Sequence, residues 1–182
     1  MGLKSFKAVM GVLAFLGFVL IINGPAFALM VGRSVSELTN DAEAVIEGKV
    51  TSIKSEWSDI KSEWSDNLNA GIVTNVNIEV TDVIKGDLIV REEVVVQTLG
   101  GEILEQNIGL QVSDQPEFQV GEEVIIFLKK HQNRNVFRSV GNFQGKMKVV
   151  GGKVSYKNKK VKTGQFKDRI RNIIAGGLDI EQ

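Results

Sequence analysis

The chain has 182 residues, with 22 basic and 22 acidic side chains and a formal net charge of zero. With 24% charged and 43% hydrophobic residues it has the composition of a globular protein, and its length suits one domain with its own core. It contains no Cys and one His, which excludes disulfides, thiol nucleophiles, Cys zinc sites and multi-His metal centres.

The first 28 residues predict a secretory signal peptide. Two lysines precede an uncharged apolar stretch over 8–22, and Ala26-Phe27-Ala28 forms a small-x-small cleavage site. The alternative is an uncleaved membrane anchor, but the apolar stretch is shorter than the roughly 20 residues that a spanning helix needs. We therefore expect export through a cleaved signal peptide, to the periplasm or the medium, and a mature domain over 29–182.

The mature chain is expected to begin with a short helix and to continue in strands. Residues 34–42 have helical character, with Ser34 or Ser36 as the N-cap. Apolar residues then alternate over 44–52 and over 72–84, and the second segment is long enough for a bent barrel strand. Further strands are expected at 93–99, 104–112, 124–128, 136–140 and 146–150, and from the following glycines to Tyr156.

Two of these segments have distinctive patterns. The continuous apolar run over 124–128 predicts a central strand that is covered on both faces. Near the end of the chain the period becomes helical, with apolar residues at 166, 170, 173 and 174, so an amphipathic helix is expected at about 163–176 with Thr163 as its N-cap. The chain is thus predicted to be mainly β: a small antiparallel OB-like barrel or sandwich with a short N-terminal helix and a C-terminal amphipathic helix.

The mature part also resembles known proteins. The segments that carry the likeness occur in order at 41–50 (DAEAVIEGKV), 74–86, 100–101 (GG), 118–123 (FQVGEE), 127–128 and 141–146 (GNFQGK). They resemble a broad, largely uncharacterised family of exported bacterial proteins, and more remotely the netrin-like, OB-type barrels that include tissue inhibitors of metalloproteinases. Those inhibitors hold the target's zinc through an N-terminal Cys, which this chain lacks, so no functional residue carries over.

A tandem duplication is the first candidate for function. The heptapeptide IKSEWSD occurs at 53–59 and again at 60–66, and it contains both tryptophans, Trp57 and Trp64. These residues could grip a glycan, a peptide or a membrane interface. The alternative is a duplication that lengthened a hairpin loop, with one Trp covering the barrel rim. In a strand only one copy can continue with the proper side inward, because a seven-residue shift reverses the faces.

Charge segregation is the second candidate. Residues 146–171 carry a net charge of +9 and residues 29–145 a net charge of −9. A basic region of this density could bind an anionic envelope surface or polysaccharide. The alternative is a solvated hairpin and helix face that the acidic half of the domain neutralises. The candidate residues are Lys157, Lys159, Lys160, Lys162, Lys167, Arg169 and Arg171.

No catalytic arrangement is evident. His131 lies in a polar turn, and the acidic neighbours Glu92-Glu93 and Glu122-Glu123 border strands, where adjacent side chains point to opposite faces. We expect no cofactor, no metal and no nucleic-acid partner. The sequence predicts an exported, non-catalytic binding or envelope-associated module of unknown ligand. The alternatives are an accessory or inhibitor of a secreted peptidase and a hydrolase that uses unrecognised carboxylates.

Overall fold

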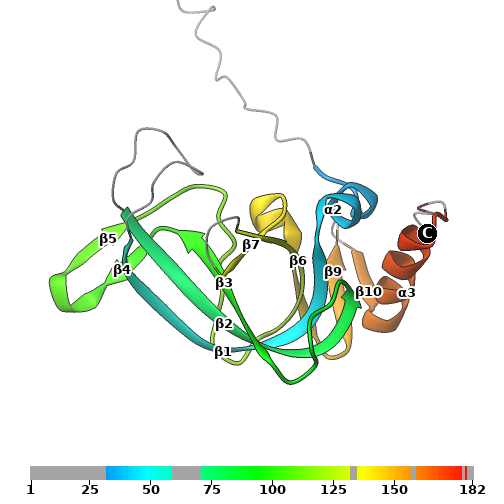
Figure 1. Ribbon diagram of the computed structural model, residues 1–182, viewed down its shortest axis with the longest axis horizontal. Helices are drawn as coiled ribbons and strands as arrows, with labels where there is room; N and C mark the ends of the chain where they lie inside the picture. Colours follow the sequence, from blue (N-terminus) through cyan, green and yellow to red (C-terminus); the bar gives the residue numbers. More distant parts are fainter. Residues whose placement is uncertain (1–31, 59–70, 132–134, 157–158, 178, 180–182) are drawn as a thin grey trace, which may run out of the picture. The chain divides into compact units, whose positions relative to one another are not determined.

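The fold is described from a computed structural model (Figure 1), which covers residues 32–58, 71–131, 135–156, 159–177 and 179. The predicted signal peptide, the second copy of the heptapeptide with Trp64, and Lys157 lie outside the described residues. In chain order the elements are α2 (Val35–Asp41), β1 (Ala44–Ser58), β2 (Gly71–Lys85), β3 (Glu93–Leu99), β4 (Gly101–Ile103), η1 (Leu104–Gln106), β5 (Ile108–Leu110), β6 (Glu123–Lys130), β7 (Phe137–Ser139), η2 (Asn142–Gly145), β8 (Lys146–Val150), β9 (Lys153–Tyr156), β10 (Lys159–Lys162) and α3 (Thr163–Ile174).

Strands β1, β2, β3, β7 and β6 close into a barrel. β1 pairs antiparallel with β2 and with β6, β2 pairs antiparallel with β3, and β7 joins β3 to β6. The resulting order, β1-β2-β3-β7-β6-β1, is that of an OB-type barrel. This confirms the predicted OB-like architecture, except that the β3–β7 pair is parallel and the barrel is therefore not wholly antiparallel.

Strand β1 closes the barrel by pairing with both β2 and β6, and its register with β2 is irregular. Residues 44–49 of β1 pair with β6 while the whole strand runs along β2, and the register with β2 slips between Glu47 and Gly48. A Cβ atom on Gly48 would lie 2.5 Å from the side chain of Ile78 and 2.7 Å from the carbonyl oxygen of Glu79. Only glycine at position 48 therefore allows the backbones of the paired strands β1 and β2 to lie this close together.

Two hydrophobic cores share strand β6. Its residues Val124, Ile126 and Leu128 face the barrel interior, together with apolar residues of β1, β2 and β3. Ile125 and Phe127 point outward into a second core, which α2, α3, β8 and β9 cover. Both faces of β6 are thus buried, which confirms the central strand that the apolar run predicted.

The two helices cover one end of the barrel, opposite the β4–β5 hairpin (Figure 1). A capping box begins α2: Ser34 Oγ accepts from the Glu37 backbone N–H, and the Glu37 carboxylate accepts from the Ser34 N–H. The backbone hydrogen bond from Ser34 lowers the pKa of Glu37. Within the described part of the chain, no helix combines the length and the apolar character needed to cross a bilayer.

The start of α3 differs from the prediction. Thr163 is the first helical residue rather than the N-cap, and its hydroxyl makes no hydrogen bond among the described residues. The cause is β10, a strand that the sequence pattern did not predict and that leads directly into the helix. The backbone N–H of Thr163 donates to the carbonyl oxygen of Gly152, which continues the strand pairing up to the first helical turn.

Candidate binding cleft at the open end of the barrel

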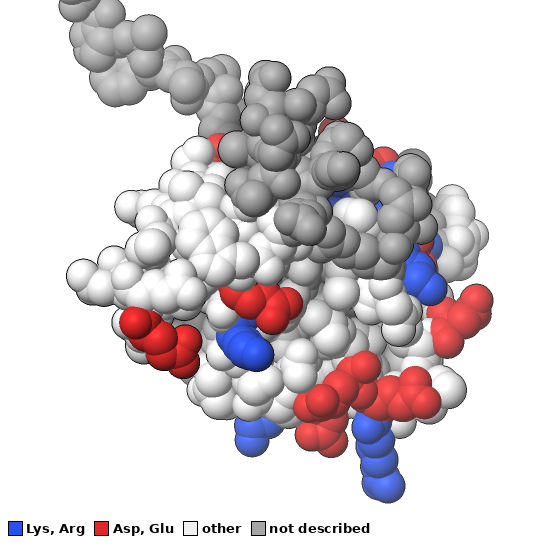
Figure 2. Space-filling model, turned by 60° about the vertical axis from the view of Figure 1, so that its left-hand side comes forward, with Lys and Arg blue, Asp and Glu red and all other residues white. Residues whose placement is uncertain are grey.

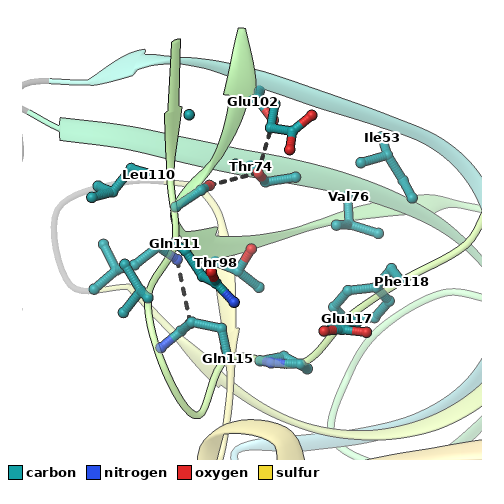
Figure 3. Close-up of a pocket in the computed structure, with 17 residues that line it drawn as sticks. Ile53, Thr74, Val76, Thr98, Glu102, Leu110, Gln111, Gln115, Glu117 and Phe118 are labelled. Atoms are coloured by element: carbon teal, nitrogen blue, oxygen red, sulfur yellow. Dashed lines mark hydrogen bonds between the residues drawn. The ribbon is translucent and has the colours of Figure 1, made fainter.

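A cleft of about 870 Å³ opens at the end of the barrel away from the helices (Figure 3). The ends of β1, β2 and β3 form one side, and the β4–β5 hairpin and residues 111–118 form the others. Its volume lies within the range of about 300–1,000 Å³ that is usual for ligand sites in proteins.

The strand register explains why the barrel interior becomes polar at this end. Ile53 of β1 lies opposite Val76 of β2, and both contact the hydrophobic core inside the barrel. Two residues further along β1, Ser55 lies opposite Thr74, which in turn lies opposite Thr98 of β3. Since alternate residues of a strand share a face, three hydroxyl side chains replace the apolar ones at the same wall of the cleft.

Hydrogen bonds link two of these hydroxyls, those of Ser55 and Thr74, to the backbone of Gly100, which follows β3. Thr74 Oγ1 donates to the carbonyl oxygen of Gly100 at 2.7 Å, and Ser55 Oγ lies 2.9 Å from Thr74 Oγ1. Because Thr74 uses its only hydroxyl proton on Gly100, Ser55 is the donor in the second bond. Gly101 lies directly on this pair with φ +134°, and a Cβ atom there would be only 2.2 Å from Thr74 Oγ1.

Trp57 lies just beyond the residues that line the cleft, of which Ser55 is the last on β1. It lies two residues beyond Ser55 on the same face of β1, and its indole N–H donates to Gln106 Oε1 at 2.9 Å, at the tip of the β4–β5 hairpin. The side chain nevertheless remains 52% exposed. Residues 53–58 of the first heptapeptide thus continue β1 as a strand.

The opposite wall is formed by Phe118 and Gln115. The Lys146 ammonium lies 4.5 Å from the centroid of the Phe118 ring, and its charge is balanced by the buried carboxylate of Glu122 at 2.5 Å. The side-chain oxygen of Gln115 accepts from the Leu99 N–H, so the amide NH₂ is the part of Gln115 that a ligand can meet. The ammonium of Lys146 beside this wall is therefore already paired within the chain.

The cleft itself contains carboxylates but no cationic side chain among the described residues that line it. Glu102 and Glu117 come from separate segments, and Figure 3 shows them apart, with Thr74, Val76 and Phe118 between or beside them. Figure 2 turns the hairpin end of the molecule forward: uncharged side chains cover much of this face, and basic side chains stand apart from one another. The site is neutral to acidic in character.

Three of the residues predicted to bind anions, Lys167, Arg169 and Arg171, form ion pairs within the chain. Lys167 contacts Glu47 at 2.7 Å and Asp82 at 3.0 Å, both on the outer surface of the barrel strands. Arg169 pairs with Asp179, and Arg171 pairs with Asp82 and Asp168. Burial acts to lower the pKa of Lys167, but its hydrogen bonds to Glu47 and Asp82 outweigh burial and raise the pKa above its usual value.

The remaining described candidates, Lys159, Lys160 and Lys162, are exposed on β10. This strand ends the sheet order, with β9 as its neighbour in the sheet. Lysines on an edge strand hinder unwanted pairing with a second sheet, which gives these residues a structural role. The structure places none of the described basic candidates among the residues that line the cleft, whereas Trp57 lies two residues beyond the lining residue Ser55.

Sequence reasoning missed most of the cleft. Thr74 and Thr98 stand at inward positions of strands that are otherwise apolar, and this substitution of a hydroxyl for an aliphatic side chain is the signal that could have found them. Gln111 and Gln115 follow the hairpin in a segment with only weak alternation and carry no such signal.

Within the described ranges, no group of three or more His, Cys, Asp and Glu side chains lies close enough to hold a metal ion. No protein-family model matches the chain, and no curated protein matches its sequence. Function is therefore to be inferred from the chemistry of the cleft.

Proposed function

We propose that the protein is an exported, non-catalytic binding module and that the cleft at the open end of the barrel is its binding site. The observation that supports this most directly is the cleft itself: about 870 Å³ of space walled by hydroxyl, amide and carboxylate side chains over an apolar floor. Its two carboxylates stand apart on separate segments, which favours binding over the paired acid and base of a hydrolase.

A substitution that fills the cleft tests this proposal. Gly109 lines the cleft without a positive φ, and a Cβ atom there would meet only the flexible side chain of Glu102, at 3.3 Å, and the Gly101 carbonyl oxygen at 3.7 Å. Gly109→Phe should therefore block the site while the barrel remains folded. Gly164→Phe is the matched control, because Gly164 lies in the first turn of α3 and has open space around its Cβ position.

The measurement is affinity capture from the envelope extract and culture fluid of cells that make the protein naturally. Captured carbohydrate, protein and small molecules are identified by mass spectrometry. We expect wild type and Gly164→Phe to retain a component that Gly109→Phe loses. If all three chains retain the same material, or none, the cleft is not the binding site.

Export is tested separately, because it depends on residues 1–28 rather than on the cleft. Secreted or periplasmic protein should begin near Leu29 when its N-terminus is sequenced. A chain that still begins with Met1 and stays in the membrane fraction would contradict cleavage.

A further inference from the structure

The charge of the cleft restricts the ligand. Its described lining includes Glu102 and Glu117 and no Lys, Arg or His. An anionic polymer would therefore meet two carboxylates and no counter-charge, which disfavours nucleic acid and acidic polysaccharide. The described residues also contain no group of three or more His, Cys, Asp and Glu side chains that could hold a metal ion. A neutral ligand with many hydrogen-bonding groups suits the lining best.

Trp57, two residues beyond the lining residue Ser55, supplies an apolar platform next to the cleft. Its indole N–H is already used by Gln106 in the hairpin, which fixes the ring while leaving 52% of the side chain exposed. What Trp57 can offer a ligand is therefore the face of its ring rather than its polar edge. Such a face suits a flat ring that carries C–H groups, and holding it in advance reduces the entropy cost of binding.

The residues that line the cleft include both apolar and polar side chains. Ile53, Val76 and Phe118 form the apolar part, while Thr98 and the amides of Gln111 and Gln115 form the polar part. A pyranose ring has the complementary pattern, with apolar faces and a ring of hydroxyls at its edge. Each hydroxyl both donates and accepts, so amide, carboxylate and hydroxyl side chains can all serve it.

We propose that the cleft binds a neutral oligosaccharide. One pyranose ring stacks on Trp57 next to the cleft, and the hydroxyls of neighbouring units bond to Glu102, Gln111 and Gln115 inside the cleft. This inference rests on the proposed function, because it names the ligand class of the same site.

The test uses the mature chain on an array of neutral glycans that spans glucans, chitin, mannans and galactans, followed by titration of the best oligomer. The chain has two tryptophans, so a Trp64→Phe background makes Trp57 the sole indole reporter of binding by fluorescence. We expect saturable binding that changes Trp57 emission. Trp57→Ala should weaken binding about tenfold or more, and Trp57→Phe should recover part of the loss.

Charge variants distinguish a neutral glycan from a cationic ligand. The double variant Glu102→Gln, Glu117→Gln keeps acceptors and donors for sugar hydroxyls but removes both charges. We expect it to weaken glycan binding several-fold, because a neutral amide accepts from a sugar hydroxyl less strongly than a carboxylate, while affinity stays unchanged as salt rises from about 50 to 500 mM. A cationic ligand would instead bind wild type in a salt-dependent way and lose its binding in this variant. Spermine and polylysine serve as cationic probes, and heparin as an anionic one.

The outcomes separate the two proposals. Binding to no neutral glycan on the array overturns the oligosaccharide proposal, as does binding to polylysine, spermine or heparin that salt abolishes. If the Gly109→Phe variant still loses a component that wild type captures, the binding function stands with a ligand of another class. If that difference is also missing, both proposals fail together.

Discussion

The two ends of the barrel differ in whether their polar side chains are paired within the chain or exposed to solvent. At the end covered by α2 and α3, a second core is sealed by helices, and charged side chains meet partners from distant segments, as Lys167 meets Glu47 and Asp82. At the open end, Trp57 and Leu104 are 52% and 82% exposed, and hydroxyl, amide and carboxylate side chains face a cleft. At the covered end the charged side chains of α3 named above are paired within the chain, whereas the open end presents polar side chains to solvent.

The difference shows that charge segregation in sequence need not survive folding. The basic C-terminal third folds back onto the acidic body, so that α3 is joined to the barrel by ion pairs. Part of the segregation that suggested an anion-binding surface is thereby cancelled in space. The lysines of β10 remain exposed, and the described lining of the cleft contains two carboxylates and no cationic side chain.

The largest expected effect is on stability at the covered end. Phe166 of α3 is 1% exposed, and its ring lies 5.9 Å from that of Tyr156. Phe166→Ala should lower the free energy of unfolding by about 3–5 kcal/mol, because it leaves a cavity in the second core, which α2 and α3 cover. Trp57→Ala removes a larger side chain at the open end but should cost no more than about 1 kcal/mol. Urea unfolding of both variants measures the contrast, and equal losses would contradict it.

The second prediction concerns the close approach that shapes the open end. Gly101→Ala adds a methyl group against the Ser55 and Thr74 hydroxyls and forces a positive φ on alanine. We expect a loss of about 2–4 kcal/mol. Gly121→Ala is the matched control: its φ is +86° and its Cβ position is empty, so it should cost about 1 kcal/mol. Similar losses in thermal or urea unfolding would mean that the hairpin does not depend on this contact.

Much of the fold was predictable because strand alternation reports which face is buried. The sequence prediction of strands at 93–99 and 146–150 is confirmed as β3 and β8, and the capping role of Ser34 is confirmed as well. β10 was missed because Lys159–Lys162 has a single apolar residue, and its pairing depends on β9 rather than on its own pattern. The resemblance to exported bacterial proteins and to netrin-like barrels stays a prediction.

The cleft was harder to predict, since it depends on register between strands. Ser55, Thr74 and Thr98 are far apart in sequence, and only the pairing of β1, β2 and β3 places them in one row. The pairing of Lys167 with Glu47 and Asp82 is likewise a long-range consequence of where α3 packs. Local patterns located Trp57 as a candidate but could not show what lies next to it.

The third prediction concerns how much the contacts of Lys167 with Glu47 and Asp82 contribute to the free energy of unfolding. Lys167→Met keeps the length of the side chain but removes its bonds to Glu47 and Asp82, and we expect a loss of about 1–2 kcal/mol at neutral pH. Lys162→Met, on the exposed edge strand, should change stability by less than about 0.5 kcal/mol. Chemical denaturation of the two variants gives the comparison.

The pH dependence of this effect has a definite sign. Because folding raises the pKa of Lys167, its contribution is fully present below the unfolded pKa of about 10.4 and is lost as the pH rises through the folded pKa. The stability difference between wild type and Lys167→Met should therefore hold from pH 7 to about pH 10 and shrink above it. A difference that shrank on acidification to pH 6 would point to another cause.

The smallest expected effect on stability comes from replacing the β10 lysines. The same variant also tests which end of the molecule binds a partner. The triple variant Lys159→Gln, Lys160→Gln, Lys162→Gln should unfold within about 0.5 kcal/mol of wild type, because these side chains are exposed. It should aggregate more readily, since it loses the charges that guard an edge strand. On anionic vesicles, wild type should be retained only at low salt, because exposed charges are screened near about 150 mM. Retention that persists at that salt concentration and disappears in the triple variant would move the binding surface from the cleft to the basic end of the sheet.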